Sequence, residues 1–135
     1  MLAEMQTLGR AIKVAQYRHH RAANAALTSA GTTLAQWDAL RAIDMAPGSS
    51  AHDLAVATFQ SDQAFGTLAT RLITQGLIER ENVHGRRIEH RLTQAGAQVL
   101  ADGSEVVDGV LAMSFRNLTA SERATLTELL GKVDP

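Results

Sequence analysis

The sequence predicts a mainly α-helical protein that carries one small β-hairpin. Apolar residues recur every three or four positions through most of the chain, and capping residues such as Thr33 and Ser61 precede several of these stretches. Both features are typical of helices. Between residues 61 and 96, one such helix ends abruptly at Gly76 and two short strand-like runs follow it. We therefore expect a set of helices interrupted by a single hairpin.

The composition limits the class of protein. The chain has 135 residues, which suits one domain or one protomer of a small oligomer. It contains no cysteine, which excludes disulfides and thiolate metal sites and fits a reducing compartment such as the cytoplasm. No stretch resembles a secretory signal or approaches the ~18 apolar residues of a membrane span. We therefore expect a cytoplasmic protein with no membrane partner.

The net charge of −1 does not by itself indicate nucleic acid, but its distribution is informative. Residues 1–100 hold ten Lys and Arg against eight Asp and Glu, whereas residues 101–135 hold three against six. The arginines gather in the first predicted helix and in the hairpin. We therefore expect any phosphate backbone to meet the first hundred residues and not the acidic C-terminal part.

Residues 3–29 are predicted to form one long helix. A thin apolar stripe runs along it, made of Met5, Leu8, Ile12, Ala15, His19, Ala22 and Ala26. Such a stripe favours packing against another helix, within the chain or between subunits. His19 lies on this stripe. The more common role of a histidine there is packing against a neighbouring helix, and the alternative is a role in a ligand pocket or in pH sensing. Gly31 is expected to end this helix.

Two shorter helices are predicted next. Thr33 should cap the first of them in a capping box with Gln36. One side of this helix carries Trp37, Leu40 and Ile43, and Trp37 is expected to anchor the core between helices. Ser50 opens the second helix, in which Leu54 and either Val56 or Ala57 can face inward.

The helix from Ser61 to about Gln75 has two different faces. We expect the inner face to consist of Ala64, Phe65, Leu68, Leu72 and Ile73. The outer face is small and hydrogen-bonding, with one cation, and consists of Gln63, Gly66, Thr67, Thr70, Arg71 and Thr74. Glycine costs a helix interior about 1 kcal/mol relative to alanine. Gly66 is understandable if a ligand approaches the backbone there or if a neighbouring helix packs against it.

The hairpin and two further helices complete the chain. Residues 77–80 and 88–92 should form strands around a tip of His84, Gly85, Arg86 and Arg87. Thr93 should cap a long helix over residues 94–115, weakened by Gly103 and Gly109. Thr119 should begin a short terminal helix in a capping box.

Two short helices joined by a tight turn and followed by a hairpin make a winged helix-turn-helix, which fits DNA. A helix enters the major groove and reads base edges with polar side chains. Helix N-termini attract phosphates, and arginines at a hairpin tip reach phosphates or a minor groove. A solvated charged turn is the alternative explanation of the tip. The candidate DNA-binding residues are Ser50, Ser61, Gln63, Thr67, Thr70, Arg71, His84, Arg86 and Arg87.

The chain resembles the MarR family of transcriptional regulators over roughly residues 5–133. The order and spacing of several short motifs carry the resemblance. These are Thr33 to Leu40 at a helix start, Leu54-Ala55, Gly76 to Arg80 at a helix exit, His84-Gly85-Arg86 in the wing and Leu92 to Gly96 after it.

One position departs from the family pattern. His84 stands where the family carries an aspartate that braces the wing arginine, here Arg86. The resemblance assigns Arg86 a minor-groove role but leaves its bracing in doubt. A neutral histidine accepts a hydrogen bond from arginine, whereas a protonated one repels it. We therefore hypothesise that DNA affinity changes with pH near the histidine titration range.

The resemblance implies a homodimer. Residues 1–30 and 96–135 would form its helical dimerisation region, and residues 33–95 its winged helix-turn-helix lobe. Two recognition helices would bind a pseudopalindromic operator, and the protein would act as a repressor. A small aromatic or anionic effector would bind between the lobe and the dimer helices. Its candidate lining is Tyr17, Arg18, His19, Trp37 and Arg41.

Two other functions are alternatives to DNA-binding regulation. An enzyme is not favoured, because the sequence holds no paired carboxylates, no metal-ligand spacing, no phosphate loop and no Ser-His-Asp set. No cofactor is expected for the same reason. The other rival is a winged-helix module that binds protein without binding DNA, and the arginine wing and polar helix face argue against it. The operator, the effector and the choice between repression and activation stay open at this level.

Overall fold

The computed structural model describes residues 1–83, 85 and 87–135. Over these residues the chain forms six helices and one antiparallel pair of strands, which confirms the predicted fold class. In chain order the elements are α1 (Leu2–Ser29), α2 (Leu34–Met45), α3 (Ala51–Ala57), α4 (Asp62–Thr74), β1 (Ile78–Val83), β2 (Arg87–Leu92), α5 (Gln94–Ser114) and α6 (Ala120–Leu130).

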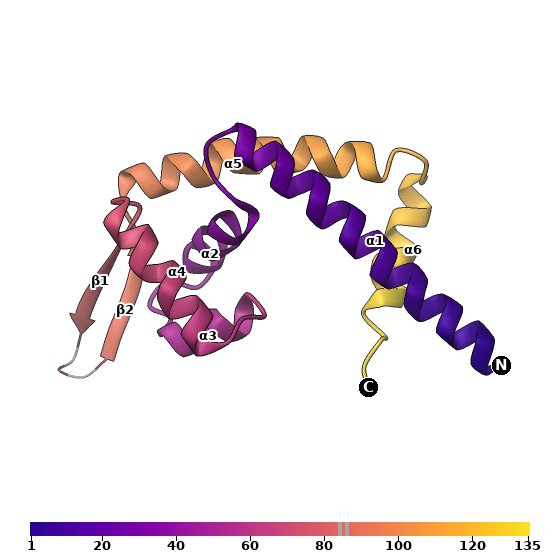
Figure 1. Cartoon of the computed structure of the whole chain (residues 1–135), viewed down its shortest axis with the longest axis horizontal. Coiled ribbons are helices and arrows are strands. Elements are labelled where there is room, and N and C mark those ends of the chain that lie inside the picture. Colours follow the sequence, from indigo (N-terminus) through magenta and orange to yellow (C-terminus); the bar gives the residue numbers. More distant parts are fainter. Residues whose placement is uncertain (84, 86) are drawn as a thin grey trace.

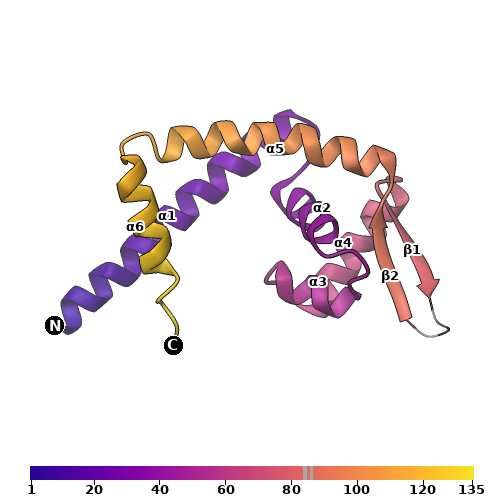
Figure 2. The same cartoon turned by 180° about the vertical axis from the view of Figure 1, so that it is seen from behind.

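The elements separate into a lobe and a helical arm, which is made of α1, α5 and α6. The lobe consists of α2, α3, α4 and the hairpin, and it lies beneath one end of α5 (Figure 1). The other end of α5 extends away from the lobe and leads into α6, while α1 descends from the middle of α5 toward the N-terminus (Figures 1 and 2). The two chain termini therefore lie on the side opposite the hairpin.

The predicted helix starts are correct, because a capping residue acts through its immediate neighbours. The N-cap hydroxyl accepts a hydrogen bond from the backbone N–H three residues later at Thr33, Ser50, Ser61, Thr93 and Thr119. The other hydrogen bond of the expected capping box, in which the Gln36 side chain would reach back to the Thr33 backbone N–H, is wrong. The side-chain oxygen of Gln36 instead accepts from the hydroxyl of Thr32 at 3.1 Å, and both residues are buried. Tertiary burial thus redirects a side chain that local sequence assigned to the helix end.

The lobe has its own apolar core. Leu40, Leu54, Phe65, Leu72 and Ile78 are almost completely buried in it. Two expectations about inward residues are wrong. Ala64 is exposed, and so are both Val56 and Ala57, one of which was expected to face inward. Ala69 and Ala55 are buried instead. The helix-turn-helix packs α3 and α4 closely, and small residues let the two helices approach.

A second core joins the lobe to the arm. It is formed by Ala23 and Leu27 of α1, Leu34 and Trp37 of α2, and Val107 of α5. Gly103 of α5 is buried in this core, and a Cβ there would lie 2.7 Å from Trp37 Cδ1. The expectation that Gly103 only weakens its helix is therefore incomplete. Its missing side chain makes the room that the indole ring occupies.

A tight junction ties the start of α5 to the exit of α4. The Thr93 backbone N–H donates to the carbonyl of Leu77 at 3.0 Å, and the Thr93 hydroxyl donates to the carbonyl of Gly76 at 2.6 Å. A Cβ on Gly96 would lie 1.9 Å from the Leu77 carbonyl oxygen. Only glycine permits this approach, so α4, the hairpin and α5 are connected at one point.

The N-terminal part of α1 and all of α6 are exposed. The predicted apolar stripe of α1 does not face the rest of the chain, because its first members Met5, Leu8 and Ile12 are exposed. Among the described residues of α6 none is buried, and Leu129 and Leu130 face solvent. The buried positions of α1 are Ala23 and Leu27 near its C-terminal end. Within one protomer these apolar surfaces are uncovered.

A histidine lies in the core of the lobe. His90 of β2 is 3% exposed, and its ring meets Phe65 edge-on at a centroid distance of 6.3 Å. Burial lowers the pKa of His90, a backbone hydrogen bond to Ser49 opposes this, and the charge of Arg80 lowers the pKa further. Its Nδ1 atom is buried without a hydrogen-bond partner among the described residues. The environment of His90 thus favours its neutral form.

The packing at Gly103 predicts opposite effects of two alanine substitutions in α5. Gly103→Ala should lower the free energy of unfolding by about 1–3 kcal/mol, because the added methyl overpacks the core against Trp37. Gly109→Ala places its methyl in open space and should raise that free energy by up to about 1 kcal/mol, the gain in helix propensity. Urea unfolding of both variants checks this. Equal stability of the two variants would contradict the tight contact.

The buried His90 predicts a loss of stability in mild acid. The pKa of His90 is lower in the folded protein than in the unfolded chain, where it is about 6.5. As the pH falls through about 6.5, the unfolded chain therefore binds the proton first, and unfolding becomes more favourable. His90→Gln, which cannot titrate, should lose less unfolding free energy than the wild type between about pH 7.5 and pH 5.5. Urea unfolding at the two pH values measures this.

A matched substitution at another histidine controls for general acid effects. The pKa of His52 is raised by its hydrogen bond to Asp62 and by the charge of that carboxylate. Its contribution to stability is therefore present at low pH and is lost as the pH rises through its folded pKa. His52→Gln should not flatten the acid loss, and the same flattening in both variants would refute the assignment to His90.

Candidate functional site

The outward face of α4 gathers the polar residues that the sequence singled out. Ser61 caps the helix by accepting from the Ala64 backbone N–H at 3.1 Å, and Asp62 lies in the first turn. The exposed side chains along this face are Gln63, Thr67, Thr70, Arg71 and Thr74. The opposite face supplies Phe65, Ala69 and Leu72 to the core. The periodicity of the helix therefore presents one amide, three hydroxyls and one guanidinium to solvent.

The three threonines of this face are held in fixed orientations. Their hydroxyls donate to the carbonyl four residues earlier, Thr67 to Gln63 at 3.1 Å, Thr70 to Gly66 at 3.0 Å and Thr74 to Thr70 at 3.0 Å. Because the hydroxyl protons are engaged, the oxygens are left mainly as acceptors and the methyl groups have defined positions. In addition, Thr70 accepts from the Arg80 guanidinium of β1 at 3.3 Å. Thr70 thus links α4 to the hairpin.

Gly66 lies on the open side of α4. A Cβ built there meets no atom within 4 Å, so no helix of this protomer packs against it. Of the two explanations offered by the sequence, packing of Gly66 against a neighbouring helix of this protomer is wrong. A glycine in a helix interior lowers stability by about 1 kcal/mol relative to alanine. The free space over the backbone leaves room for a ligand to approach.

The N-termini of α3 and α4 are joined by an ion pair that sequence reasoning missed. His52 Nδ1 lies 2.9 Å from Asp62 Oδ1, and both side chains are exposed. Nothing in the local sequence pattern pairs two residues ten positions apart on different helices. Ser50 caps α3 through the Asp53 backbone N–H at 3.2 Å, and Ser50 is half-buried. Ser50 and Ser61, which the sequence proposes as DNA-binding residues, therefore each cap the helix that follows them.

The hairpin forms beside α4 as a regular antiparallel pair. Arg91 of β2 pairs with two carboxylates of β1, at 3.2 Å from Glu79 and 3.2 Å from Glu81. These exposed pairs contribute little to stability, but they neutralise acidic charge on the wing. The predicted tip residues His84 and Arg86 lie outside the described residues, so the pH hypothesis at His84 stays a prediction. Arg87 is the first residue of β2.

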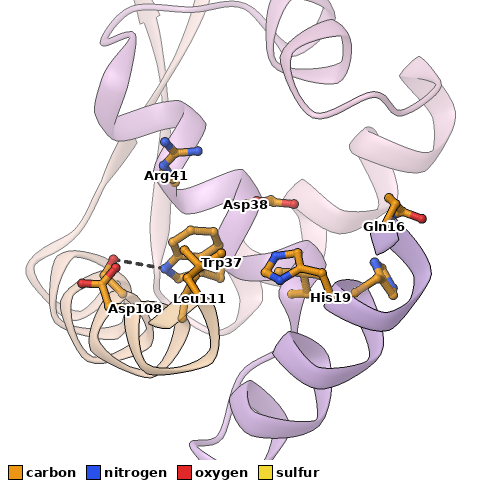
Figure 3. Close-up of a pocket in the computed structure, with 11 residues that line it drawn as sticks. Gln16, His19, Trp37, Asp38, Arg41, Asp108 and Leu111 are labelled. Carbon is orange, nitrogen blue, oxygen red and sulfur yellow. Dashed lines mark hydrogen bonds between the residues drawn. The ribbon is translucent and has the colours of Figure 1, made fainter. Parts of the chain in front are cut away.

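A cavity of about 460 Å³ lies where α1, α2 and α5 meet (Figure 3). Its lining consists of Gln16, His19, His20, Leu34, Trp37, Asp38, Arg41, Ser104, Val107, Asp108 and Leu111. Three of the five predicted ligand-binding residues, His19, Trp37 and Arg41, are among them. The cavity therefore lies between the lobe and the arm.

The other two predicted ligand-binding residues do not line this cavity. Tyr17 is exposed, and the Arg21 guanidinium lies 5.8 Å from the centre of its ring. Arg18 belongs to a separate groove along α1. Successive helical residues point about 100° apart, so His19 turns toward α2 while its two predecessors turn away. Asp38 and Asp108 were missed, because which residues of α2 and α5 face the cavity depends on how the helices pack.

The cavity combines an aromatic wall with charged groups. The Arg41 guanidinium lies 5.7 Å from the centre of the Trp37 ring, and the indole N–H donates to the Ser104 hydroxyl at 3.2 Å. Burial raises the pKa of Asp38, although the charges of Arg41 and the two neighbouring histidines oppose this rise. His19 Nδ1 is buried and has no hydrogen-bond partner among the described residues. The cavity thus offers an aromatic ring, a guanidinium, an imidazole and the carboxylates of Asp38 and Asp108 to whatever enters it.

Within residues 1–83, 85 and 87–135, no group of three or more His, Cys, Asp or Glu side chains could hold a metal ion. In the same part of the chain, no helix has both the length and the apolar character needed to span a bilayer.

Comparisons with known proteins give a consistent result. Residues 30–88 match the MarR family model. Apo wild-type MarR from E. coli is 30% identical, with 95% of this chain and 97% of that chain covered and a TM-score of 0.80. A mutant of the same protein complexed with operator DNA is 28% identical, with 100% and 99% covered and a TM-score of 0.88. A comparison with curated protein sequences found no match.

A third relative was solved with a small molecule. It is a MarR family protein from Mycobacterium tuberculosis in complex with salicylic acid, 26% identical, with 94% of this chain and 96% of that chain covered and a TM-score of 0.78. The family model, the identity over nearly the whole chain and the winged helix-turn-helix geometry therefore agree. This chain belongs to the MarR family and is a DNA-binding transcriptional regulator.

Proposed function

We propose that this protein is a homodimeric repressor that binds pseudopalindromic operators and is released from them by a small aromatic anion. The observation that carries the proposal is the match over the whole chain to a MarR chain complexed with operator DNA. We assign this function to the cytoplasm, the compartment that holds the DNA. Deletion of the gene should raise transcription of the genes beside the operator, and a fall would instead indicate an activator.

In the proposed complex, α4 lies in the major groove and the hairpin lies beside it. The Gln63 amide can both donate to and accept from base edges, and the fixed oxygen of Thr67 can accept from an exocyclic amine. Arg71 supplies the cation of this face. In a dimer the two α4 helices would meet successive major grooves about 34–36 Å apart. The wing arginines Arg86 and Arg87 are proposed, from sequence, to reach the adjacent backbone or minor groove.

The DNA-binding proposal predicts a salt-dependent affinity with a defined role for Arg71. Binding to genomic fragments should weaken steeply as salt rises. Arg71→Ala should weaken binding and reduce the slope of log affinity against log salt by about 1 if its side chain meets a phosphate. Lys132→Ala removes an exposed cation of the acidic C-terminal part. Once sedimentation has shown that this variant is still dimeric, it should change neither value. Fluorescence anisotropy over a salt series measures both. Salt-independent or absent binding would favour a protein-interaction module.

The dimer is argued from apolar surface that one protomer leaves uncovered. Large apolar side chains are exposed on the N-terminal half of α1, on α6 and beyond it, namely Met5, Leu8, Leu129, Leu130 and Val133. Monomeric soluble proteins rarely expose contiguous apolar surface of more than a few hundred Å². We assign residues 1–30 and 96–135 to the dimer interface and residues 33–95 to the DNA-binding lobe.

This assignment predicts that a charge on α6 breaks the dimer. Leu129→Asp should shift the protein toward monomer, because a carboxylate buried in an apolar interface is strongly unfavourable. It should also weaken operator binding, since one protomer meets one half-site only. Met45→Asp, at a similarly exposed apolar position of the lobe, is the control and should stay dimeric. Sedimentation velocity distinguishes the species, and a dimeric Leu129→Asp variant would refute the assignment.

The effector is proposed to occupy the cavity between α1, α2 and α5. An aromatic ring could lie against Trp37, with its anionic group near Arg41 and its polar substituents near His19 (Figure 3). The complex of the related M. tuberculosis protein with salicylic acid supports this chemical class. A ligand in this cavity changes the populations of the lobe orientations only to the extent that it binds one orientation more tightly than another.

Salicylate is the probe that tests the cavity. Trp37 is the single tryptophan of the chain, so quenching of its fluorescence reports binding directly. Arg41→Gln should weaken salicylate binding about tenfold or more, because hydrogen bonds to a charged group contribute about 1.5–3 kcal/mol. Arg18→Gln changes a cation that does not line this cavity and should leave the affinity unchanged. Equal affinity of the wild type and Arg41→Gln would contradict the proposed orientation.

A further inference from the structure

The turn between α3 and α4 holds an unusual residue. Phe59 has a φ of +58°, and among the described residues it is the one non-glycine residue in the left-handed region. Its side chain is 97% exposed. A bulky residue is disfavoured in this conformation, which glycine adopts freely. An exposed Phe ring also gains nothing from burial. Neither the local backbone nor the packing of the protomer accounts for a Phe here.

The backbone conformation is imposed by the end of α3. The Phe59 N–H donates to the Val56 carbonyl at 3.1 Å, and the Gln60 N–H donates to the Ala55 carbonyl at 2.9 Å. These two bonds form a Schellman motif in which Phe59 takes the position that glycine usually occupies. The Thr58 hydroxyl adds a bond to the Leu54 carbonyl at 2.7 Å. These three hydrogen bonds fix the backbone of the turn, and with it the direction in which the Phe59 Cα–Cβ bond leaves the chain.

The start of α4 does not use the ring either. A residue directly before a helix cap often packs against the fourth helical residue, as a hydrophobic staple. With Ser61 as the cap, these positions are Gln60 and Phe65, so Phe59 is one residue too early. Phe65 is already completely buried within the lobe. Val56, three residues before Phe59, is also exposed. Two exposed apolar side chains, Val56 and Phe59, thus lie at the C-terminal end of α3.

The neighbourhood of Phe59 identifies the partner. The turn lies two residues before the cap of α4, whose first turns expose Gln63 and Thr67. The ion pair between His52 and Asp62 brings the start of α3 to the same end of the helix. Under the proposed function, operator DNA approaches this end. The major groove offers one apolar group on base edges, the 5-methyl group of thymine.

We propose that Phe59 is a specificity-determining residue that packs on a thymine 5-methyl group at the edge of each operator half-site. The proposal rests on the proposed function, because it requires DNA at α4. The left-handed backbone of Phe59 then has a use, since it directs the side chain out of the turn that precedes α4. An apolar contact of this kind neutralises no phosphate, so it raises affinity without changing the salt dependence.

The test compares two proteins on two forms of one operator. The DNA is the shortest genomic fragment that the wild type retains, made with thymine or with deoxyuridine, which lacks the methyl group. Wild type should bind the deoxyuridine form about fourfold more weakly for each contacted methyl. Phe59→Asn should bind the thymine form about tenfold more weakly than wild type, with an unchanged salt slope, and should not distinguish the two forms.

Controls separate this proposal from its alternatives. Asparagine tolerates the left-handed region, so Phe59→Asn should be at least as stable as wild type in urea. Met45→Asn removes another exposed apolar side chain of the lobe and should leave operator affinity unchanged. The proposal is overturned if Phe59→Asn binds the operator as tightly as wild type does, or if deoxyuridine weakens the binding of both proteins equally. In either case operator binding itself stands. A smaller assembly of Phe59→Asn in sedimentation would mean that Phe59 binds a second copy, and would also overturn it. Absence of operator binding by wild type removes the proposed function and this inference together.

Discussion

The contact between Trp37 and Gly103 is the constraint on which the arrangement of the molecule depends. The indole ring occupies space that any side chain at position 103 would fill, and its N–H is satisfied by Ser104. Because Trp37 is on α2 and Gly103 is on α5, this one contact orients the lobe against the arm. The same ring forms a wall of the cavity and lies under the Arg41 guanidinium. A molecule bound there would therefore meet the element that sets the lobe orientation.

A second attachment joins the lobe to the start of α5. Thr93 bonds to the carbonyls of Gly76 and Leu77, and Gly96 lets the backbone of α5 touch that of the α4 exit. Arg80 meanwhile joins β1 to Thr70 on the outward face of α4. The recognition helix and the wing are consequently linked to each other and to the start of α5. Under the proposed function, these contacts offer a route by which a change at the cavity could reach the DNA-binding surface.

Local features of the site were predictable from sequence, and features that depend on packing were not. The caps at Ser50 and Ser61 and the polar face of α4 follow from spacing within one helix, and the structure has them. The inward assignment of Val56 is wrong because α3 is too short for periodicity to define a face. Tyr17 was placed in the cavity on its chemistry, and the rotation of α1 against α2 turns it away. The burial of His90 could have been predicted from the alternation of side chains along β2, which places His90 on the same inward face as Leu92.

The sequence by itself determined the order and the ends of the helices, the position of the hairpin and the resemblance to MarR regulators. Each of these depends on residues a few positions apart, whose conformations are set by backbone sterics and nearby hydrogen bonds. The tertiary structure decided which groups meet across the chain. It paired His52 with Asp62, buried His90 against Phe65, fitted Trp37 over Gly103 and left Phe59 bare. The physical reason is that packing selects among many possible long-range contacts by shape and burial, and a linear pattern carries no record of that selection.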